Sequence, residues 1–124
     1  MRAFAIESAD TEARLLDLPT PAPVPGEVLV RVQSASVNGF DLAVAAGMLV
    51  GAMEHRYPVV LGKDFAGTVA AVGDGVTRFA PGDAVFGVVM KPFLGDGSIA
   101  EYVTVSEQYG IERLPDGLDA TTAG

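Results

Sequence analysis

Cysteine is absent from this 124-residue sequence, and histidine occurs once, as His55. Without thiols the chain can form no disulfide, no thiolate nucleophile and no cysteine-ligated zinc or iron–sulfur centre. It also lacks the run of about 18 apolar residues that a membrane-spanning helix needs. The sequence has 8 basic and 16 acidic residues, and the basic residues form no cluster. The net charge of −8 therefore argues against a site for nucleic-acid phosphates. These absences favour a soluble protein with no nucleic-acid or membrane partner.

The length of the chain supports one domain over residues 1–124, because a chain of this size can bury well over half of its unfolded surface in one core. The residues after Met1 alternate like a strand and lack the charged and long apolar regions of a secretory signal. We therefore expect no targeting segment and a cytoplasmic location.

Short apolar stretches separated by proline and glycine turns predict a mostly β domain. The predicted strands are residues 2–7, 14–18, 28–37, 65–72, 84–90, 99–105 and 111–114. A short helix is predicted over 40–46, ended by Gly47, and 48–56 is interpreted as a loop. Residues 118–124 have the pattern of the start of another helix. The number and close spacing of the strands favour a partly open barrel.

One predicted strand changes its apolar period partway along. Apolar side chains occupy the even positions from Val28 to Val32, but beyond Gln33 they occupy odd positions up to Val37. Because side chains alternate between the two faces of a sheet, this change of parity predicts a β-bulge or a sharp bend before the strand ends at Asn38.

The stretch 57–75 combines the longest apolar run with a polar break, Gly62-Lys63-Asp64. Charges placed inside an apolar run are costly unless they reach water, a partner or a ligand. The break therefore marks either a loop at a cleft or the edge of a site. Lys63 beside Asp64 is also explained by a solvated surface pair.

A dinucleotide-binding motif has to be considered, because Gly95-Asp96-Gly97-Ser98-Ile99-Ala100 matches G-x-G-x-x-A. That motif binds pyrophosphate only where it follows a strand and opens a helix. Here the residues that follow, 101–105, alternate like a strand. We therefore predict that this segment is a turn and that the chain contains no nucleotide-binding fold.

The order of residues from Tyr57 to Gly87, x-P-x-x-L-G-x-D-x-A-G-x-V-x-x-V-G-x-G-V-x-x-F-x-x-G-D-x-V-F-G, resembles the N-terminal GroES-like catalytic domain of the medium-chain dehydrogenases/reductases. Within that superfamily it is most similar to the zinc-independent quinone oxidoreductases. The resemblance covers the chain from Met1 to about Leu118 and implies a mostly β, partly open GroES-like barrel. It also implies that an NADPH- or NADH-binding Rossmann domain, absent from these residues, completes the enzyme.

The same resemblance implies that the catalytic zinc of the alcohol dehydrogenases is missing. Where those enzymes have a cysteine ligand, a hydroxyl proton relay and a histidine ligand, this chain has Asn38, Phe40 and Lys63. The cysteine-rich structural-zinc loop is also missing. His55 is expected to be a solvated histidine, since a catalytic zinc needs about three protein ligands.

Asn38 and Lys63 are the candidate catalytic residues. The Asn38 amide can bind a cofactor ribose hydroxyl or a substrate carbonyl, and it can equally cap a strand end. Lys63 can polarise a carbonyl. Asp41, Asp64 and Tyr57 are assigned to structural or cleft positions, with Asp41 explained by capping of the helix alone.

The sequence thus favours half of an NAD(P)H-dependent, zinc-independent oxidoreductase that reduces quinones or α,β-unsaturated carbonyls, with the full-length protein a homodimer. The cofactor would carry the hydride chemistry and this domain would orient and enclose it. The alternative is a stand-alone GroES-like binding or assembly module without catalytic activity, because fold shape alone does not decide function.

Overall fold

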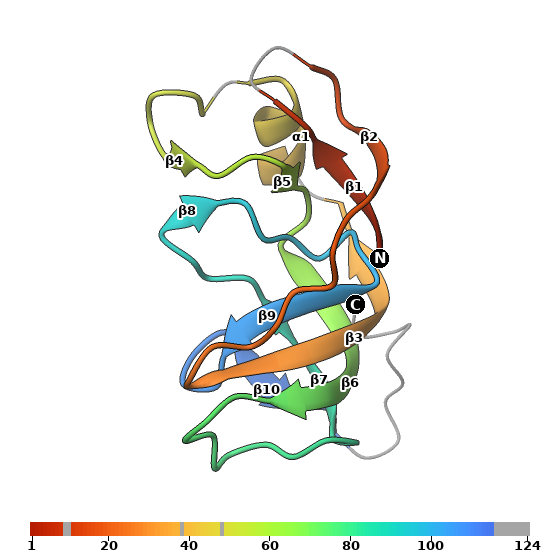
Figure 1. Cartoon of the computed structure of the whole chain (residues 1–124), viewed down its shortest axis with the longest axis vertical. Coiled ribbons are helices and arrows are strands. Elements are labelled where there is room, and N and C mark those ends of the chain that lie inside the picture. Colours follow the sequence, from red (N-terminus) through yellow and green to blue (C-terminus); the bar gives the residue numbers. More distant parts are fainter. Residues whose placement is uncertain (9–10, 38, 48, 116–124) are drawn as a thin grey trace.

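The computed structural model describes residues 1–8, 11–37, 39–47 and 49–115 (Figure 1). Within them most regular structure is β, which confirms the predicted fold class. The elements are β1 (Arg2–Ile6), β2 (Arg14–Asp17), β3 (Glu27–Ser36), α1 (Gly39–Ala45), β4 (Glu54–His55), β5 (Val59–Val60), β6 (Asp64–Val72), β7 (Ala84–Val88), β8 (Phe93–Leu94), β9 (Tyr102–Ser106) and β10 (Ile111–Arg113). No helix among the described residues is long and apolar enough to cross a membrane.

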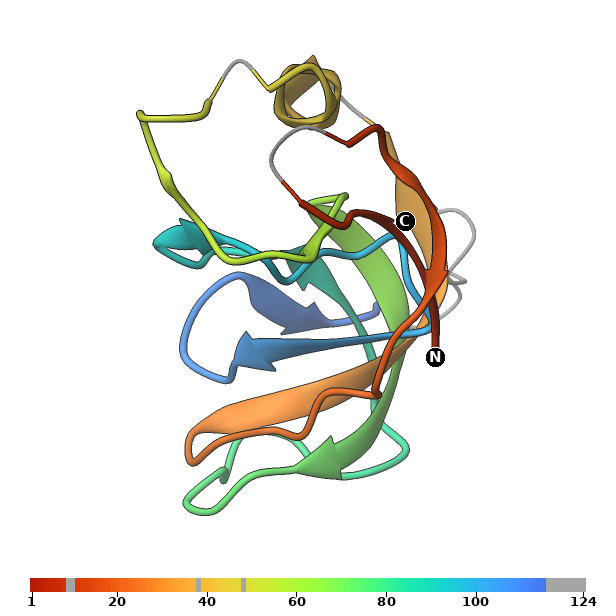
Figure 2. The same cartoon turned by 45° about the horizontal axis from the view of Figure 1, so that its top comes forward.

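The strands form three sheets. The largest has the order β10-β7-β6-β3-β9, and all of its neighbours are antiparallel. A second sheet has the order β2-β1-β5, and the third is the two-stranded parallel pair of β4 and β8. Among the described strands none joins β9 to β10, so the barrel is partly open, as predicted. Figure 2 shows α1 above the sheets, beside the β1–β2 hairpin.

The predicted irregularity in β3 is confirmed. Its pairing with β6 shifts register between Leu29 and Val30 and again between Val32 and Ser34. The second shift coincides with the change of apolar parity in the sequence, because an extra residue turns the following side chains to the other face. Beyond this point β3 pairs only with β6, and its end at Ser36 lies opposite Asp64.

The main core fills the space enclosed by the five-stranded sheet. Val28 and Val30 of β3 are fully buried there, because their even positions face inward. Phe65 and Val69 of β6 pack against them. Each such side chain contributes about 1.5–3 kcal/mol relative to an exposed one. A second cluster, which includes Val44 and Leu61, packs α1 onto the rest of the domain.

Some boundaries differ from the prediction. Strand β9 begins at Tyr102 rather than at residue 99, because the preceding segment bonds to β1 instead: Phe4 N–H donates to the Ile99 carbonyl and Glu101 N–H to that of Arg2. Similarly, β7 ends at Val88 rather than at residue 90.

The other predicted elements differ less. The predicted loop 48–56 contains β4, which is too short to produce a periodic pattern of apolar residues in the sequence. The helix agrees within one residue, and Gly47, at a φ of 77°, follows it. The segment 118–124 lies outside the described residues.

Candidate active site

Lys63 and Asp41 line the same small cavity, although they are far apart in the sequence. Lys63 immediately precedes β6, and its carbonyl accepts a hydrogen bond of 2.8 Å from Val89 N–H. Asp41 lies in the first turn of α1 and is buried, with 3% of its surface exposed. The bend of β3 and the packing of α1 thus bring a cation and a buried carboxylate to the same place.

The environment of Lys63 acts on its ammonium group in two ways. Desolvation by burial lowers its pKa below the ordinary value, and the negative charge of Asp41 partly opposes this effect. Lys63 is half-buried rather than fully solvated. The interpretation of Lys63 as one member of a solvated surface pair is therefore wrong. The sequence does not show this, because Asp41, whose charge raises the pKa of Lys63, is distant from it in the chain.

Asp64 is placed by the strand ladder. It is paired with Ser36 on β3 and with Val88 on β7, and Ser36 Oγ donates to its Oδ2 at 3.3 Å. Asp64 thus joins three strand ends beside Lys63. This position agrees with its assignment to a structural or cleft role, which remains a prediction.

The space beside Lys63 is small. Asp41 and Lys63 line a cavity of about 10 Å³, which is about the room that one water needs. A cavity of this size among the described residues does not enclose a substrate. Three apolar side chains on or next to the elements that carry these residues are exposed: Val37 beyond the end of β3, Leu42 on α1 and Val88 on β7 are 63%, 64% and 41% exposed.

Tyr57 and His55 belong to other cavities. Their rings stack with centroids 5.8 Å apart, and both line a cavity of about 260 Å³ beside α1 and the β1–β2 hairpin. The structure does not bring Tyr57 into the cavity of Lys63 and Asp41. Asn38 lies outside the described residues, so its predicted role stays a prediction.

His55 is not the solvated histidine that the sequence suggested. Its Nδ1 is 2.8 Å from the carbonyl of Met53 and donates to it, and its Nε2 is buried without a hydrogen-bond partner among the described residues. The sequence carries no signal for this, because His55 lies against residues that are distant in the chain, such as Ile6 and Val44, which line the same cavity.

The residues present do not fit a catalytic zinc ion. Among the described residues there is no group of three histidine, cysteine, aspartate or glutamate side chains that could hold a metal. At the position of the polar break, the protonated Lys63 ammonium has no lone pair to donate. That the protein carries no zinc remains a prediction.

The turn with the dinucleotide motif has a different explanation. A Cβ at Gly97 would lie 2.1 Å from the Val60 carbonyl oxygen, so glycine is required by the close approach of β5. The segment leads into strand β9 and not into a helix. This agrees with the prediction that it is a turn.

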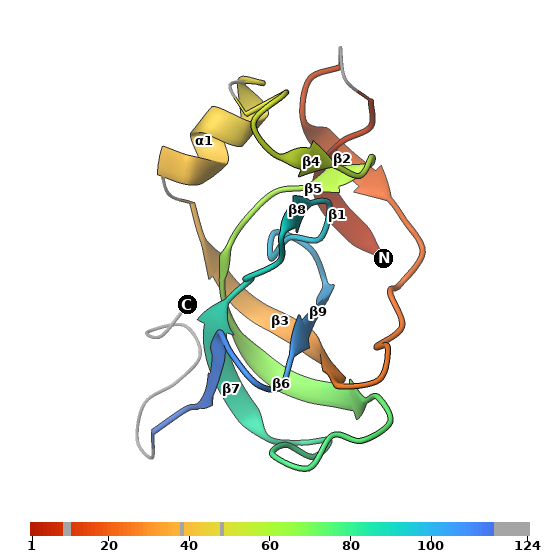
Figure 3. The same ribbon diagram turned by 90° about the vertical axis from the view of Figure 1, so that its left-hand side faces the viewer.

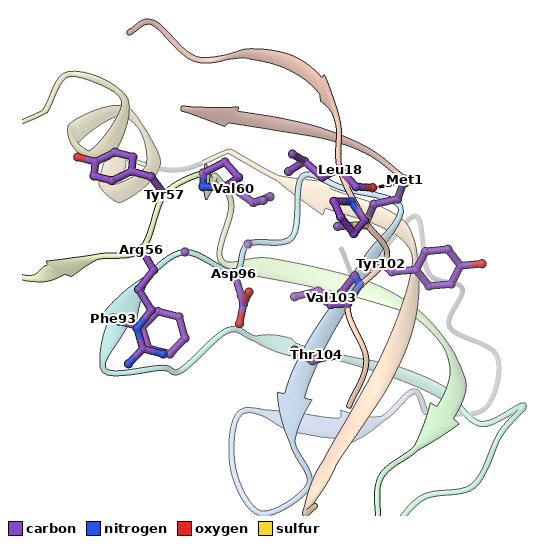
Figure 4. Close-up of a pocket in the computed structure, with 15 residues that line it drawn as sticks. Met1, Leu18, Arg56, Tyr57, Val60, Phe93, Asp96, Tyr102, Val103 and Thr104 are labelled. Carbon is purple, nitrogen blue, oxygen red and sulfur yellow. Dashed lines mark hydrogen bonds between the residues drawn. The ribbon is translucent and has the colours of Figure 1, made fainter. Parts of the chain in front are cut away.

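The cavities beside β9 were missed by the sequence reasoning, and one of them shares Val60, Gly95 and Asp96 with the small cavity of Lys63 and Asp41. Two adjoining cavities of about 430 and 470 Å³ share five residues, namely Pro21, Arg56, Phe93, Asp96 and Thr104. Figure 4 shows Arg56 stacked on Phe93, with Asp96 facing Val103 and Thr104 across the open space. The guanidinium carbon is 3.7 Å from the ring centroid. We call the two cavities together the β9 groove.

Residues 24–116 match the family described as Alcohol dehydrogenase GroES-like domain. The chain is 34% identical to Quinone-oxidoreductase QR1, chloroplastic, of Triphysaria versicolor, over 88% of this chain and 32% of that protein. The quinone oxidoreductase of Coxiella burnetii has a similar structure, with a TM-score of 0.83 and 28% identity over 99% of this chain and 39% of that one. A mycobacterial protein complexed with NADPH has a TM-score of 0.75 and 26% identity over 97% and 35%.

The chain spans about a third of the length of these relatives. The matched segment nevertheless includes every strand from β3 to β10 and the Lys63–Asp41 pair. The chain therefore belongs to the alcohol dehydrogenase GroES-like domain family, as a catalytic domain of the quinone oxidoreductase type among the medium-chain dehydrogenases/reductases.

Proposed function

We propose that this domain is the catalytic half of a zinc-independent, NAD(P)H-dependent oxidoreductase that reduces quinones or α,β-unsaturated carbonyls. Oxidoreductase activity agrees with the family, and use of NADPH agrees with the mycobacterial relative. The Rossmann domain that would bind most of the cofactor, and a homodimeric full-length protein, are parts of the same proposal.

The observation that carries this proposal is the half-buried Lys63 ammonium beside the buried Asp41 carboxylate. A cation in a partly desolvated place interacts more strongly with developing negative charge than one in water. Lys63 would therefore stabilise the oxygen of a quinone or enone as electron density moves onto it. Asp41 supports this role because its charge favours the protonated form of Lys63.

When bound, the nicotinamide cofactor supplies the hydride. The chain's own contribution would be to hold the carbonyl oxygen at Lys63 Nζ, to orient the cofactor ribose or the substrate with the Asn38 amide, and to exclude water. The exposed apolar side chains of Val37, Leu42 and Val88 support a face that another domain covers.

The proposal is tested in the full-length protein by Lys63→Met, with Arg14→Met as the matched control. Arg14 is an exposed cation on β2, paired with Glu7 at 3.2 Å and remote from Lys63 in the sequence and the sheets. Lys63→Met should lower kcat/KM for a quinone with NADPH by roughly tenfold to a hundredfold, and Arg14→Met should not change it. Equal kcat/KM for wild type and Lys63→Met, both folded, would reject the role of Lys63.

Asn38 is tested separately by Asn38→Ala. If its amide makes one or two hydrogen bonds to cofactor or substrate, kcat/KM should fall by roughly tenfold to a hundredfold, with little change in Tm. If Asn38 only caps the strand end, Asn38→Ala should lower the stability of the protein by about 1 kcal/mol and leave catalysis unchanged.

The zinc-free assignment is tested by elemental analysis of the purified protein. It should find no stoichiometric zinc, and one tightly held zinc per chain would reject the assignment.

A further inference from the structure

Lys91 is a nearly buried cation that lies outside the proposed reductase site. Its side chain is 12% exposed, and its ammonium group donates to Asp96 Oδ2 at 2.5 Å and to the Thr104 hydroxyl at 3.0 Å. Glu27 Oε2 lies 3.4 Å from the same Nζ. An ammonium group has three hydrogens to donate, so these three partners can use all of them. Lys91 is therefore held where the start of β3, the middle of β9 and the segment between β7 and β9 meet.

Asp96, the closest partner of Lys91, is also a neighbour of the proposed site. It lines the cavity of about 10 Å³ that Asp41 and Lys63 line. Figure 3 shows how the chain brings it there: the segment after β7 turns at β8, which pairs with β4, and then returns to β9. Because the cavity has room for about one water, the residues around it lie close to one another. Asp96 thus stands between two lysines, Lys91 and Lys63.

The carboxylate of Asp96 is turned toward Lys91. Its side chain faces Val103 and Thr104 in Figure 4, and among the described residues its only ion pair is with Lys91. The residues before and after it are glycines, which add no side chain that would restrict its rotation about χ1. The ion pair with Lys91 is therefore the charged contact that holds Asp96 in this orientation.

A different orientation of Asp96 would change the charge around Lys63. The carboxylate of Asp41 already acts on the Lys63 ammonium, and Asp64 follows Lys63 in the chain. A further carboxylate turned toward Lys63 would make its surroundings more negative. It would compete for the ammonium group and oppose the negative charge that develops on a substrate oxygen. The ion pair with Lys91 keeps this carboxylate occupied elsewhere.

We propose that Lys91 is a positioning residue, which holds the Asp96 carboxylate away from Lys63 and thereby keeps the Lys63 ammonium available to the substrate oxygen. This inference rests on the proposed role of Lys63 in the reductase reaction. Lys91 itself touches neither substrate nor cofactor and acts only through Asp96. The contacts of Lys91 lie within this chain, so they do not depend on which segments cover its surface in the full-length protein.

The test is a mutant cycle in the full-length protein, with kcat/KM for a quinone and NADPH as the measurement. Lys91→Met should lower kcat/KM roughly tenfold, because a carboxylate released beside Lys63 acts on it with the strength of about one pKa unit. With Asp96→Asn already in place, no carboxylate is left to release at this position. Lys91→Met should then change kcat/KM by less than about twofold relative to Asp96→Asn alone.

The matched control is Glu27→Gln in the Lys91→Met background, which removes an equal charge from the same ion cluster. Glu27 is not among the described residues that line the cavity of Lys63. Its side chain is 18% exposed, less than the 38% of Asp96. If Lys91 only stabilised the fold, removal of the more buried unpaired carboxylate would help most, and Glu27→Gln would restore kcat/KM at least as well as Asp96→Asn. We expect restoration by Asp96→Asn and none by Glu27→Gln.

A titration of Lys63 by lysine NMR, without substrate or cofactor, gives a second readout that does not use activity. Asp41, Asp64 and Asp96 are the carboxylates beside Lys63, from α1, β6 and the segment after β8. The pKa of Lys63 should rise by about one unit in Lys91→Met, because a further negative charge favours the protonated form. Adding Asp96→Asn should cancel the rise. Unchanged kcat/KM in Lys63→Met would reject the proposed function, whereas this titration tests Lys91 whatever Lys63 does in catalysis.

Two results would overturn the proposal. An unchanged pKa of Lys63 in folded Lys91→Met would show that Lys91 does not keep Asp96 away from Lys63. Restoration of kcat/KM by Glu27→Gln as complete as that by Asp96→Asn would make Lys91 a purely structural cation. If Lys91→Met does not fold, Lys91→Gln, which keeps a donor for the Thr104 hydroxyl, takes its place in the cycle and is judged by the same two results.

Discussion

Replacement of Gly97 by alanine is the sharpest test of how the segment 95–99 is built against β5. The φ of Gly97 is not positive, so alanine can adopt its backbone conformation and only the space around it matters. A Cβ there would lie 2.1 Å from the carbonyl oxygen of Val60 and 2.4 Å from that of Leu61. Both atoms belong to the backbone, which cannot rotate away as a side chain would.

The cost follows from the hydrogen bonds that hold the two segments together. Val60 N–H donates to the Gly95 carbonyl at 2.8 Å, Ile99 N–H to that of Leu61 at 2.9 Å, and Ser98 N–H to that of Gly62 at 3.1 Å. Separation of the segments weakens all three, at about 1 kcal/mol each, so Gly97→Ala should lose about 3 kcal/mol. For a chain of this size the Tm should fall by about 10 °C.

The assay is urea and thermal unfolding followed by circular dichroism, with Gly39→Ala as the control. A Cβ at Gly39 meets nothing within 4 Å, and this residue begins α1. The control should therefore be unchanged or stabilised by about 0.4–1 kcal/mol. A loss below about 1 kcal/mol in Gly97→Ala would refute the close approach of the two backbones.

Three further predictions concern the core and two ionisable groups. Phe65→Ala should cost about 3–5 kcal/mol of unfolding free energy in urea titrations, because Phe65 is 1% exposed at the centre of the main core, and a cost below about 1 kcal/mol would contradict that packing. The pKa of Glu107 is lowered by the backbone N–H groups of Arg78 and Thr77, so its stabilising contribution is present above the unfolded pKa and is lost as pH falls through the folded pKa. Glu107→Gln should be less stable than wild type at neutral pH, and the difference should vanish in acid. The pKa of Lys63 is lowered by burial, so the unfolded chain binds more protons between the folded and unfolded pKa values. Stability measured by chemical unfolding should therefore rise with pH in that alkaline window in wild type, and a rise of the same size in Lys63→Gln would contradict this assignment.

The features that could be predicted from the sequence are those that produce a periodic pattern of apolar residues or require one residue type at a given position. The parity change after Gln33 located a register shift of β3, because alternation is fixed by the pleat. The helix was located by its stop at Gly47, which has a positive φ. The motif from Tyr57 to Gly87 indicated the family, which the match over 24–116 confirms.

The features that could not be predicted depend on contacts between distant residues. Asp41 in isolation is explained by its place in the first turn of a helix, and its proximity to Lys63 exists only once β3 has bent and α1 has packed. The pair of β4 and β8 has two residues in each strand, too few for a pattern. The β9 groove arises from the connector and the turn before β9, and neither segment has a sequence signal for a cavity.

The strand order of the large sheet has a consequence for how the chain reaches its folded state. Strand β3 pairs with β9, for example Leu29 with Thr104, and also with β6, although α1 lies between β3 and β6 in the sequence. In this sheet only β6 and β7 are neighbours that also follow each other in the sequence. Such non-local pairing slows folding, because the loops must close before the contacts form. During synthesis β3 would leave the ribosome long before β9, and one of its edges would stay unpaired until residues 102–106 emerge. Until then this edge would be open to aggregation, so the yield of folded protein should depend on protection of the nascent chain during that interval.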